Sequence, residues 1–274
     1  MNYTELICKK PVDTEELEIL IAELAALGFE SFTEEEDRLL AYIPEKDFSD
    51  QLLKESDYLR EHLEVITVNS IKEQNWNAVW ESNYEPVCIR NCGIRAPFHP
   101  ANNELAYDIV IQPKMSFGTA HHETTALIID MLLDEDVRGK KVLDMGCGTG
   151  VLAILASMKG AAHITAIDND EWAYTNTLEN CGLNNIDNIT VALGDEHLLG
   201  EETFGLILAN INKNVLLETI PAYARVLEKG GRIIFSGFYE NDLEDIHNKA
   251  EVNGLAYSFH KTKNNWVAAT FIKK

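Results

Sequence analysis

The chain has 274 residues, of which 46% are hydrophobic and 25% are charged, and its formal net charge is −22. This composition is typical of a globular protein, and because no apolar run reaches about 18 residues, we expect no membrane-spanning segment. The acidity disfavours direct contact with nucleic acid, since phosphate binding needs clustered Lys and Arg, and it fits either attraction of a basic partner or simple solubility.

The first part of the chain alternates between strand and helix patterns. Strands are predicted over 3–10, 30–37, 38–44 and 63–71, and helices over 13–29 and 49–62. Asp13 or Thr14 can cap the first helix and Gly28 can end it, while Ser49 or Asp50 can cap the second. The β-α-β-β-α-β order predicts a small ferredoxin-like domain. Because this part holds no glycine-rich loop or reactive cluster, we expect it to recognise a substrate rather than to catalyse.

A tryptophan pair follows this domain. Trp76 and Trp80 are four residues apart and would share one face of a short linker helix packed against a neighbouring domain. Short extended segments come after Pro86. The predicted division is therefore a recognition domain at 1–70, a linker helix at 71–85 and a larger domain at 86–274.

The five cysteines stand at irregular spacing, which indicates reduced thiols. Reduced thiols predict a cytoplasmic protein, and the N-terminus lacks the basic start and apolar core of a signal peptide. Cys88 and Cys92 are the only close pair of cysteines. A zinc site there would need two further ligands nearby, and since His99 is the sole candidate, we expect no metal site.

From about residue 123 the pattern becomes a strand-helix alternation. Five apolar strands are predicted, over 141–146, 163–168, 189–195, 204–211 and 230–238. Helical stretches such as 150–160 and 171–183 separate them, and the tail, 254–274, reads as a hairpin of two strands. Nearly continuous apolar strands are typical of a parallel sheet covered on both faces, so the pattern predicts an α/β, Rossmann-like fold.

A glycine-rich turn, "VLDMGCGTG", joins the first of these strands to a helix. The strand carries Asp144, and the turn runs through Gly146, Gly148 and Gly150. Glycines let the backbone approach a ligand closely, and the helix N-terminus offers unpaired N–H groups. The spacing "GCGTGV" departs from the G-x-G-x-x-G fingerprint of dinucleotide sites.

Polar side chains also end the next three strands. Asp168 lies 22 residues after Gly146 and can accept hydrogen bonds from both hydroxyls of a ribose, while Asp170 is the better helix cap. Asp195 and Asn210 end the third and fourth strands, and Asp195 can meet an adenine. A lone Asn after a strand is more often a turn residue, but ligands of open α/β sheets bind at the strand carboxyl ends, so the shared edge favours a functional role.

These strand ends resemble those of methyltransferases that use S-adenosylmethionine. The segments "WNAVWESNYEPV", "SFGTAHHETT" and "LANIN" make the chain similar to the PrmA-type methyltransferases, which modify large-subunit ribosomal protein eleven. The resemblance runs from about Trp76 to the C-terminus. It implies a Rossmann-like, seven-stranded methyltransferase sheet in the larger domain, beside the small ferredoxin-like α+β domain.

In that family, a phenylalanine-glycine-threonine-glycine-threonine-histidine-proline-threonine-threonine segment precedes the sheet and helps enclose the cofactor. The positions kept here are Phe117, Gly118, Thr119, His122, Thr124 and Thr125. Ala120, His121 and Glu123 replace glycine, threonine and proline. Losing the glycine is expected to stiffen the loop, while Glu123 suits the first turn of the following helix. We expect no metal at His121, His122 and Glu123, because consecutive residues diverge on any regular element.

The resemblance also implies the cofactor, the chemistry and the partner. The residues expected to bind S-adenosylmethionine are Phe117, Gly118, Thr119, Thr125, Asp144, Gly146, Gly148, Asp168, Asp195 and Asn210. Within this set, Gly146 would hold the methionine end and Asp168 the ribose. Asn210 is also the catalytic candidate, because its carbonyl can accept an amine N–H and aim the lone pair at the methyl group. The acceptors implied are lysine ε-amines and the N-terminal α-amine of ribosomal protein eleven, a basic protein substrate.

Two alternatives remain at this stage. The same machinery could methylate a glutamine amide or an RNA base, although "NINK" replaces the Asn-Pro-Pro-Tyr-type motif that favours those acceptors, and the acidity disfavours RNA. The chain could also be a non-catalytic partner of ribosomal protein that keeps the cofactor fold. We expect a monomer without direct contact to nucleic acid.

Overall fold

The structure is a computed structural model that divides into two compact units, Met1–Asn83 and Tyr84–Lys274. It describes residues 2–49, 51–72, 84–114 and 118–274. Trp76 and Trp80, on which the linker helix is predicted, and the cofactor candidate Phe117 lie outside the described residues. Within the described part, no helix is both long and apolar enough to cross a bilayer.

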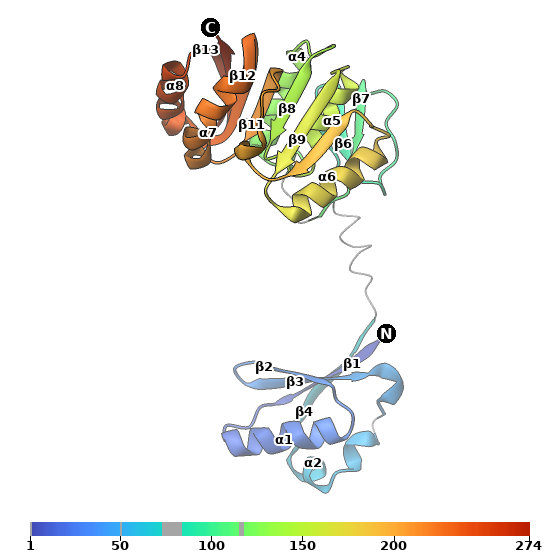
Figure 1. Ribbon diagram of the computed structural model, residues 1–274. Helices are drawn as coiled ribbons and strands as arrows, with labels where there is room; N and C mark the ends of the chain where they lie inside the picture. Colours follow the sequence, from blue (N-terminus) through green and yellow to red (C-terminus); the bar gives the residue numbers. More distant parts are fainter. Residues whose placement is uncertain (1, 50, 73–83, 115–117) are drawn as a thin grey trace. The chain divides into compact units, whose positions relative to one another are not determined.

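The first unit is a four-stranded antiparallel sheet in the order β2-β3-β1-β4 (Figure 1). Its elements are β1 (Tyr3–Lys9), α1 (Thr14–Ala26), β2 (Ser31–Glu34), β3 (Arg38–Pro44), α2 (Asp57–His62) and β4 (Val65–Ile71), with short 3₁₀ turns at Glu45–Asp47 and Leu52–Lys54. The order β-α-β-β-α-β is the one predicted from the sequence.

Local signals and burial explain the first helix. Asp13 caps α1 by accepting from two backbone N–H groups of the first turn. Leu17, Leu20 and Leu24 recur at helical spacing and are buried against the sheet. Gly28, with φ of +98°, lies just beyond the end of the helix in the conformation that glycine favours. The cap and the end of this helix were both predicted correctly.

The second helix is shorter than predicted. It begins at Asp57 rather than near residue 49, because Ser56 is its cap and accepts a hydrogen bond from the N–H of Leu59 at 3.2 Å. The same hydroxyl donates to Glu23 of α1 at 2.6 Å. This second bond fixes the place of Ser56 beside α1, and the residues before it form only a 3₁₀ turn. Ser49 therefore caps no helix, and Asp50 lies outside the described residues.

The second unit is built on a seven-stranded sheet in the order β10-β9-β8-β11-β12-β14-β13. The strands are β8 (Lys141–Met145), β9 (His163–Asp168), β10 (Ile189–Leu193), β11 (Phe204–Asn210), β12 (Leu227–Tyr239), β13 (Leu255–Lys263) and β14 (Trp266–Lys273). The strands from β8 to β12 are parallel, and β14 is antiparallel to both β12 and β13. The Rossmann-like, seven-stranded α/β prediction is confirmed.

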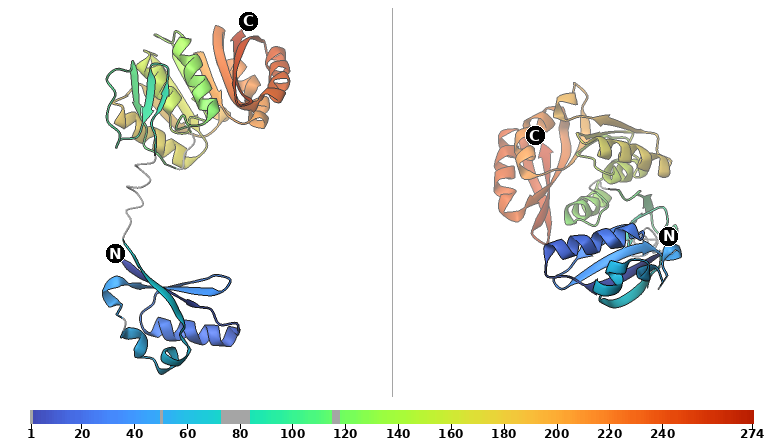
Figure 2. Two further views of the ribbon diagram at one scale, coloured as in Figure 1. Left: turned by 180° about the vertical axis from the view of Figure 1, so that it is seen from behind. Right: turned by 90° about the horizontal axis from the view of Figure 1, so that it is seen from below.

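Helices cover both faces of this sheet (Figures 1 and 2). They are α4 (Glu123–Asp134), α5 (Val151–Met158), α6 (Glu171–Leu183), α7 (Lys213–Val226) and α8 (Leu243–Val252). One buried cluster includes residues of α4, α5 and α6, and a second includes residues of α7 and α8. The two cores explain why the parallel strands read as continuous apolar runs.

A small three-stranded sheet precedes α4, formed by β5 (Val87–Ile89), β6 (Cys92–Arg95) and β7 (Tyr107–Val110). Cys88 is exposed and Cys92 is buried. His99 uses both ring nitrogens on the backbone, with Nδ1 3.1 Å from the N–H of Ala96 and Nε2 2.7 Å from the carbonyl of Tyr84. The histidine that a zinc site would need is therefore engaged elsewhere.

The cysteines differ in their surroundings. Cys8, Cys92, Cys147 and Cys181 are buried, so Cys88 is the exposed one of the five. Burial raises the pKa of the Cys8 and Cys181 thiols to about 11 and that of Cys92 to about 12. It also raises the pKa of Cys147, within the glycine turn, far above the ordinary range of a thiol. All four buried thiols are protonated at neutral pH.

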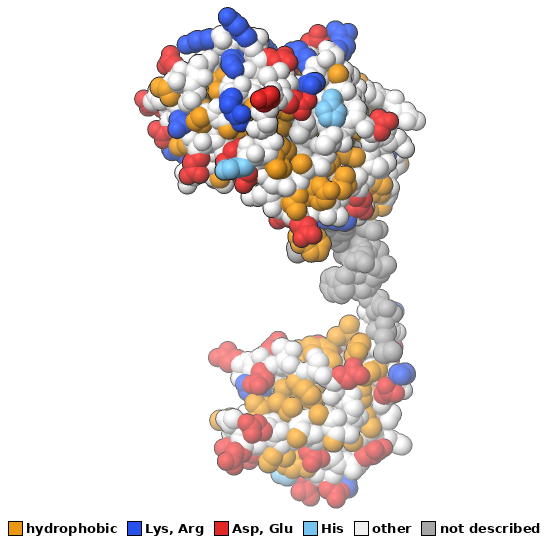
Figure 3. Space-filling view, viewed as in Figure 1, with side chains coloured by type: hydrophobic (Ala, Val, Ile, Leu, Met, Phe, Trp, Pro, Cys, Tyr) orange, Lys and Arg blue, Asp and Glu red, His pale blue; other side chains and the backbone are white. Residues whose placement is uncertain are grey.

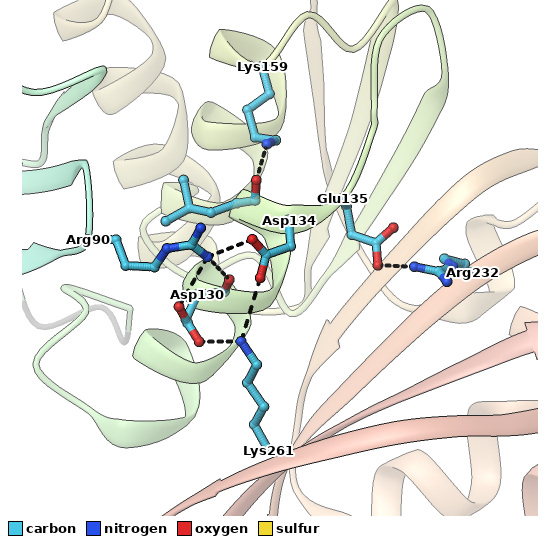
Figure 4. A network of polar contacts seen from close by, with 8 residues as sticks. Arg90, Asp130, Asp134, Glu135, Lys159, Arg232 and Lys261 are labelled. Atoms are coloured by element: carbon cyan, nitrogen blue, oxygen red, sulfur yellow. Dashed lines mark hydrogen bonds and ion pairs between the residues drawn. The ribbon is translucent and has the colours of Figure 1, made fainter.

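Charged side chains hold the outer part of α4 (Figure 4). Arg90, at the tip of the β5–β6 hairpin, approaches Asp134 at 2.8 Å and Asp130 at 3.4 Å. Lys261 of β13 lies 2.5 Å from Asp130 and 3.7 Å from Asp134. The Arg90 hydrogen bond lowers the pKa of Asp134. The pairs are partly exposed and individually weak, but together they tie the hairpin and β13 to the helix whose N-terminus carries Thr125.

Candidate active site at the carboxyl ends of the strands

The glycine turn lies between β8 and α5. Gly146, Gly148 and Gly150 all have positive φ values, of +68°, +57° and +78°. The N–H of Gly146 donates to the carbonyl of Ile167 at 2.8 Å, which holds the turn against the end of β9. A Cβ atom on Gly150 would lie 2.8 Å from Thr177. The turn therefore needs glycine for its conformation and for its packing.

Asp168 ends β9 at the mouth of this turn. One carboxylate oxygen accepts from the N–H of Gly148 at 2.9 Å, and the other accepts from the N–H of Asp170 at 3.0 Å. Each oxygen can accept one further hydrogen bond, so the half-buried carboxylate can still receive two ribose hydroxyls. Asp170 caps α6, as predicted.

Asp144 lies beneath the turn and is completely buried. One of its oxygens accepts from the N–H of Ala153 in α5 at 3.0 Å, and the other has no partner in the described part of the chain. Burial, with a smaller contribution from the charge of Asp168, raises the pKa of Asp144 to about 7. The Asp144 side chain therefore connects β8 to α5. Its direct contact with the cofactor stays a prediction.

Asn210 and Thr125 meet across 85 residues of sequence. The Nδ2 group of Asn210, the last residue of β11, donates to Oγ1 of Thr125 in the first turn of α4 at 3.2 Å. Thr125 is buried. The Oδ1 atom of Asn210 is also buried, yet none of the described groups donates to it. A buried acceptor without a partner costs about 1–3 kcal/mol, so this atom indicates where a ligand's donor belongs.

Gly237 of β12 supports the backbone just after Asn210. The N–H of Ile211 donates to the carbonyl of Ser236 at 3.1 Å, which holds the residue after β11 against β12. A Cβ atom on Gly237 would lie 2.2 Å from the carbonyl oxygen of Ile211. Sequence analysis did not single out this glycine, because "FSGF" reads as an ordinary strand with one glycine. Its signal is an isolated glycine in an apolar strand, which often marks a close backbone approach.

The start of α4 explains the two histidines and the glutamate. His122 caps the helix by accepting from the N–H of Thr124 at 3.3 Å. The ring nitrogens of His121 lie 3.0 Å from the Thr119 hydroxyl and 3.0 Å from a backbone carbonyl, and Glu123 accepts from Asn264 at 2.9 Å. The three side chains thus have different partners, and the segment begins a helix.

Ala120 has a left-handed conformation, with φ of +65°, and it is buried. This is the position at which the family pattern has glycine. A left-handed alanine costs roughly 1–2 kcal/mol relative to an ordinary backbone conformation. The loop is therefore strained at this residue, and the surrounding packing keeps it in place.

Asp195 lies beyond the end of β10, whose last residue, Leu193, pairs with Asp168. It is exposed, and it accepts from the N–H of His197 at 2.9 Å in a short turn. The structure thus brings Gly146, Gly148, Asp168 and Asp195 to one edge of the sheet, with Asn210 at the end of β11 on the other side of β8.

This strand order, with a glycine turn after β8 and an acid at the end of β9, is typical of S-adenosylmethionine-dependent methyltransferases. Residues 10–274 match the family described as Ribosomal protein L11 methyltransferase (PrmA). The chain belongs to this family, which confirms the resemblance seen in the sequence.

Relatives and a solved structure agree with that assignment. A Ribosomal protein L11 methyltransferase of Phocaeicola vulgatus is 44% identical over 100% of both chains. One from Porphyromonas gingivalis is 46% identical over 93% of this chain and 90% of its own. The crystal structure of a ribosomal protein L11 methylase from Lactobacillus delbrueckii subsp. bulgaricus has a TM-score of 0.64 at 28% identity, covering 70% of this chain and 100% of its own.

Proposed function

We propose that this methyltransferase transfers methyl groups to amines of ribosomal protein L11, namely lysine ε-amines and the N-terminal α-amine. The observation that carries the proposal is the buried, unpartnered Oδ1 atom of Asn210, which can accept an amine N–H at the end of β11. The relatives are named as methyltransferases of ribosomal protein L11. The net charge of −22 suits a basic protein substrate.

The residues present fit the cofactor. The positive φ values of the glycine turn allow a close approach of its backbone, Asp168 keeps acceptor capacity for the ribose hydroxyls, and Asp195 lies on the side where an adenine would extend. We assign Gly118, Thr119 and Thr125 to enclosing the methionine end. When bound, S-adenosylmethionine supplies a methyl group on a positively charged sulfur. What the protein adds is placement of the acceptor amine.

The acceptor amine must be neutral before it can attack. The ordinary pKa of lysine is about 10.4, so most lysines are protonated near neutral pH. Asn210 is no strong base, but its Oδ1 atom accepts an N–H of the neutral amine and thereby directs the lone pair. Thr125 accepts from the Nδ2 group of Asn210 and so presents Oδ1 to the amine.

We further propose that the first unit recognises the ribosomal protein. In this proposal residues 1–70 are the recognition domain, 71–85 the linker and 86–274 the methyltransferase domain. Val65, Ile66 and Val68 of β4 are 41–51% exposed. Figure 3 shows hydrophobic side chains on this unit interspersed with acidic ones. Such a surface suits a partner that is both basic and partly apolar. We also propose that the enzyme acts as a monomer, in the cytoplasm and without direct contact to nucleic acid, since five free cysteines suit a reducing compartment.

Intact-mass analysis of purified L11 tests both proposals. With S-adenosylmethionine and the full chain, we expect methyl additions, and amines should carry them on peptide mapping. A chain that begins at Lys72 should still bind S-adenosylhomocysteine but methylate intact L11 with kcat/KM lower by about tenfold or more. Unmodified L11 would contradict the substrate, while full activity of the shortened chain would contradict only the role of the first unit.

Replacing Asp168 with alanine is expected to weaken binding of S-adenosylhomocysteine by about ten- to a hundredfold, since hydrogen bonds to a charged group are lost. Calorimetric titration measures this affinity. Asp170→Ala is the matched control, because it removes the cap of α6 and lowers stability without touching the ribose. Equal affinities of the two variants would remove Asp168 from the ribose site.

A further inference from the structure

Two hydrogen bonds converge on Thr149, in the middle of the glycine turn. Its hydroxyl donates to the carbonyl of Gly118 at 2.7 Å, and its own carbonyl accepts from Nδ2 of Asn180 at 2.8 Å. Thr149 and Asn180 are both completely buried. Such bonds are not needed to form the turn itself, whose conformation follows from the glycines.

Asn180 extends this connection to a second part of the chain. Its Oδ1 atom accepts from the N–H of Gln112 at 2.8 Å. Gln112 and Gly118, six residues apart in the chain, are thus both connected to Thr149, Gln112 through Asn180 and Gly118 directly. Asn184, the residue that caps the C-terminus of α6, instead exchanges two hydrogen bonds with the backbone of Val110, at 2.9 and 2.7 Å.

The fit at Gly118 is close. Its φ is +110°, and a Cβ atom there would lie 2.9 Å from the hydroxyl oxygen of Thr149. Gly118 leads through Thr119 and the left-handed Ala120 into α4, where Thr125 bonds to Asn210. A shift at Thr149 is therefore transmitted to the segment that encloses the cofactor site.

We infer that Thr149 and Asn180 are positioning residues, which set the backbone at Gly118 over the glycine turn and thereby determine the affinity for the cofactor. The inference rests on the proposed cofactor site. Both residues act through the backbone that they hold, so their loss should change binding more than it changes the folded structure. We expect the hydrogen bond donated by the Thr149 hydroxyl, rather than the volume of the side chain, to set the affinity for the cofactor.

Thr149→Val and Thr149→Ser separate the hydroxyl from the shape. Valine keeps the volume but cannot donate to Gly118, and serine keeps the donor. We expect calorimetric titration with S-adenosylhomocysteine to show a Kd about tenfold higher for Thr149→Val and within about threefold of the wild type for Thr149→Ser. The KM for S-adenosylmethionine should rise in parallel, with a smaller change in kcat.

Asn180→Ala and Asn184→Ala form a second matched pair on the same helix. Both remove hydrogen bonds to backbone and both should lower Tm, but only Asn180→Ala should raise the Kd. If Thr149→Val or Asn180→Ala lowers Tm and leaves the Kd unchanged, the two residues are merely structural and the inference is wrong. If the wild type itself does not bind S-adenosylhomocysteine, the proposed cofactor site fails, and the inference fails with it.

Discussion

Replacing Asn210 with alanine is expected to lower kcat by roughly two to three powers of ten, with the affinity for S-adenosylhomocysteine changed by only a few fold. Removal of one oriented hydrogen bond in a transition state costs roughly 2.7–4 kcal/mol in oxyanion holes. For a neutral amine this cost is an upper limit. The glycine turn and Asp168 remain in place, so cofactor binding should persist. Single-turnover rates with L11 and calorimetric titration measure the two quantities separately.

Asn210→Asp sharpens this test through pH. A carboxylate has a similar shape and accepts hydrogen bonds strongly, but its charge favours the protonated amine, which cannot attack. The variant should therefore be slow at neutral pH and recover in part as the pH rises toward 10, while Asn210→Ala should show no such recovery relative to the wild type. Wild-type rates in both variants would make Asn210 a turn residue and would remove the proposed role of its Oδ1 atom.

Gly237→Ala is expected to destabilise the second unit by about 3 kcal/mol or more, from left-handed strain together with overpacking. Its new Cβ would lie 2.2 Å from the backbone oxygen of Ile211, and no rotamer change can relieve a clash with backbone. Any relaxation must move Ile211 and with it Asn210. Urea unfolding should show the loss of stability, and the remaining folded enzyme should have a lower kcat.

Gly254→Ala is the matched control for this strain. Gly254 has a φ of +77°, similar in sign and size to the +94° of Gly237, but nothing lies within 4 Å of the place where its Cβ would be. It should cost only about 1–2 kcal/mol, the penalty for the left-handed conformation alone. Equal losses in the two variants would mean that the contact with Ile211 does not control this part of the fold.

Much of the fold was predictable because its signals are local. The cap at Asp13, the cap at Asp170 and the apolar runs of β8 to β12 are each readable from a few neighbouring residues. The glycine turn and Asp168 were found because their spacing follows from one strand-turn-helix unit and its neighbour. The start of α2 was misjudged because Ser56 bonds to Glu23, a contact that no local pattern contains.

The supporting residues of the site were missed for a related reason. Thr149 and Gly118 are 31 residues apart, and Gln112 and Asn180 are 68 apart. Periodicity indicates which face of a helix is buried, but it does not indicate which backbone carbonyl a buried asparagine will meet. Residues that bind a ligand directly carry sequence signals of their own, whereas residues that hold those ligand-binding groups depend on the assembled fold.

The burial of four of the five thiols has a consequence for oxidative damage. Oxidants and alkylating reagents attack the thiolate, and burial keeps Cys8, Cys92, Cys147 and Cys181 in the protonated form at neutral pH. Cys147 stands between Gly146 and Gly148, and its Sγ atom is buried in the core 3.5 Å from the hydroxyl of Thr177, so a bulky adduct there would disrupt the packing of the glycine turn. Because its thiol is both hidden and protonated, an oxidant meets the exposed Cys88 on β5 first, and the glycine turn is chemically protected while the enzyme stays folded.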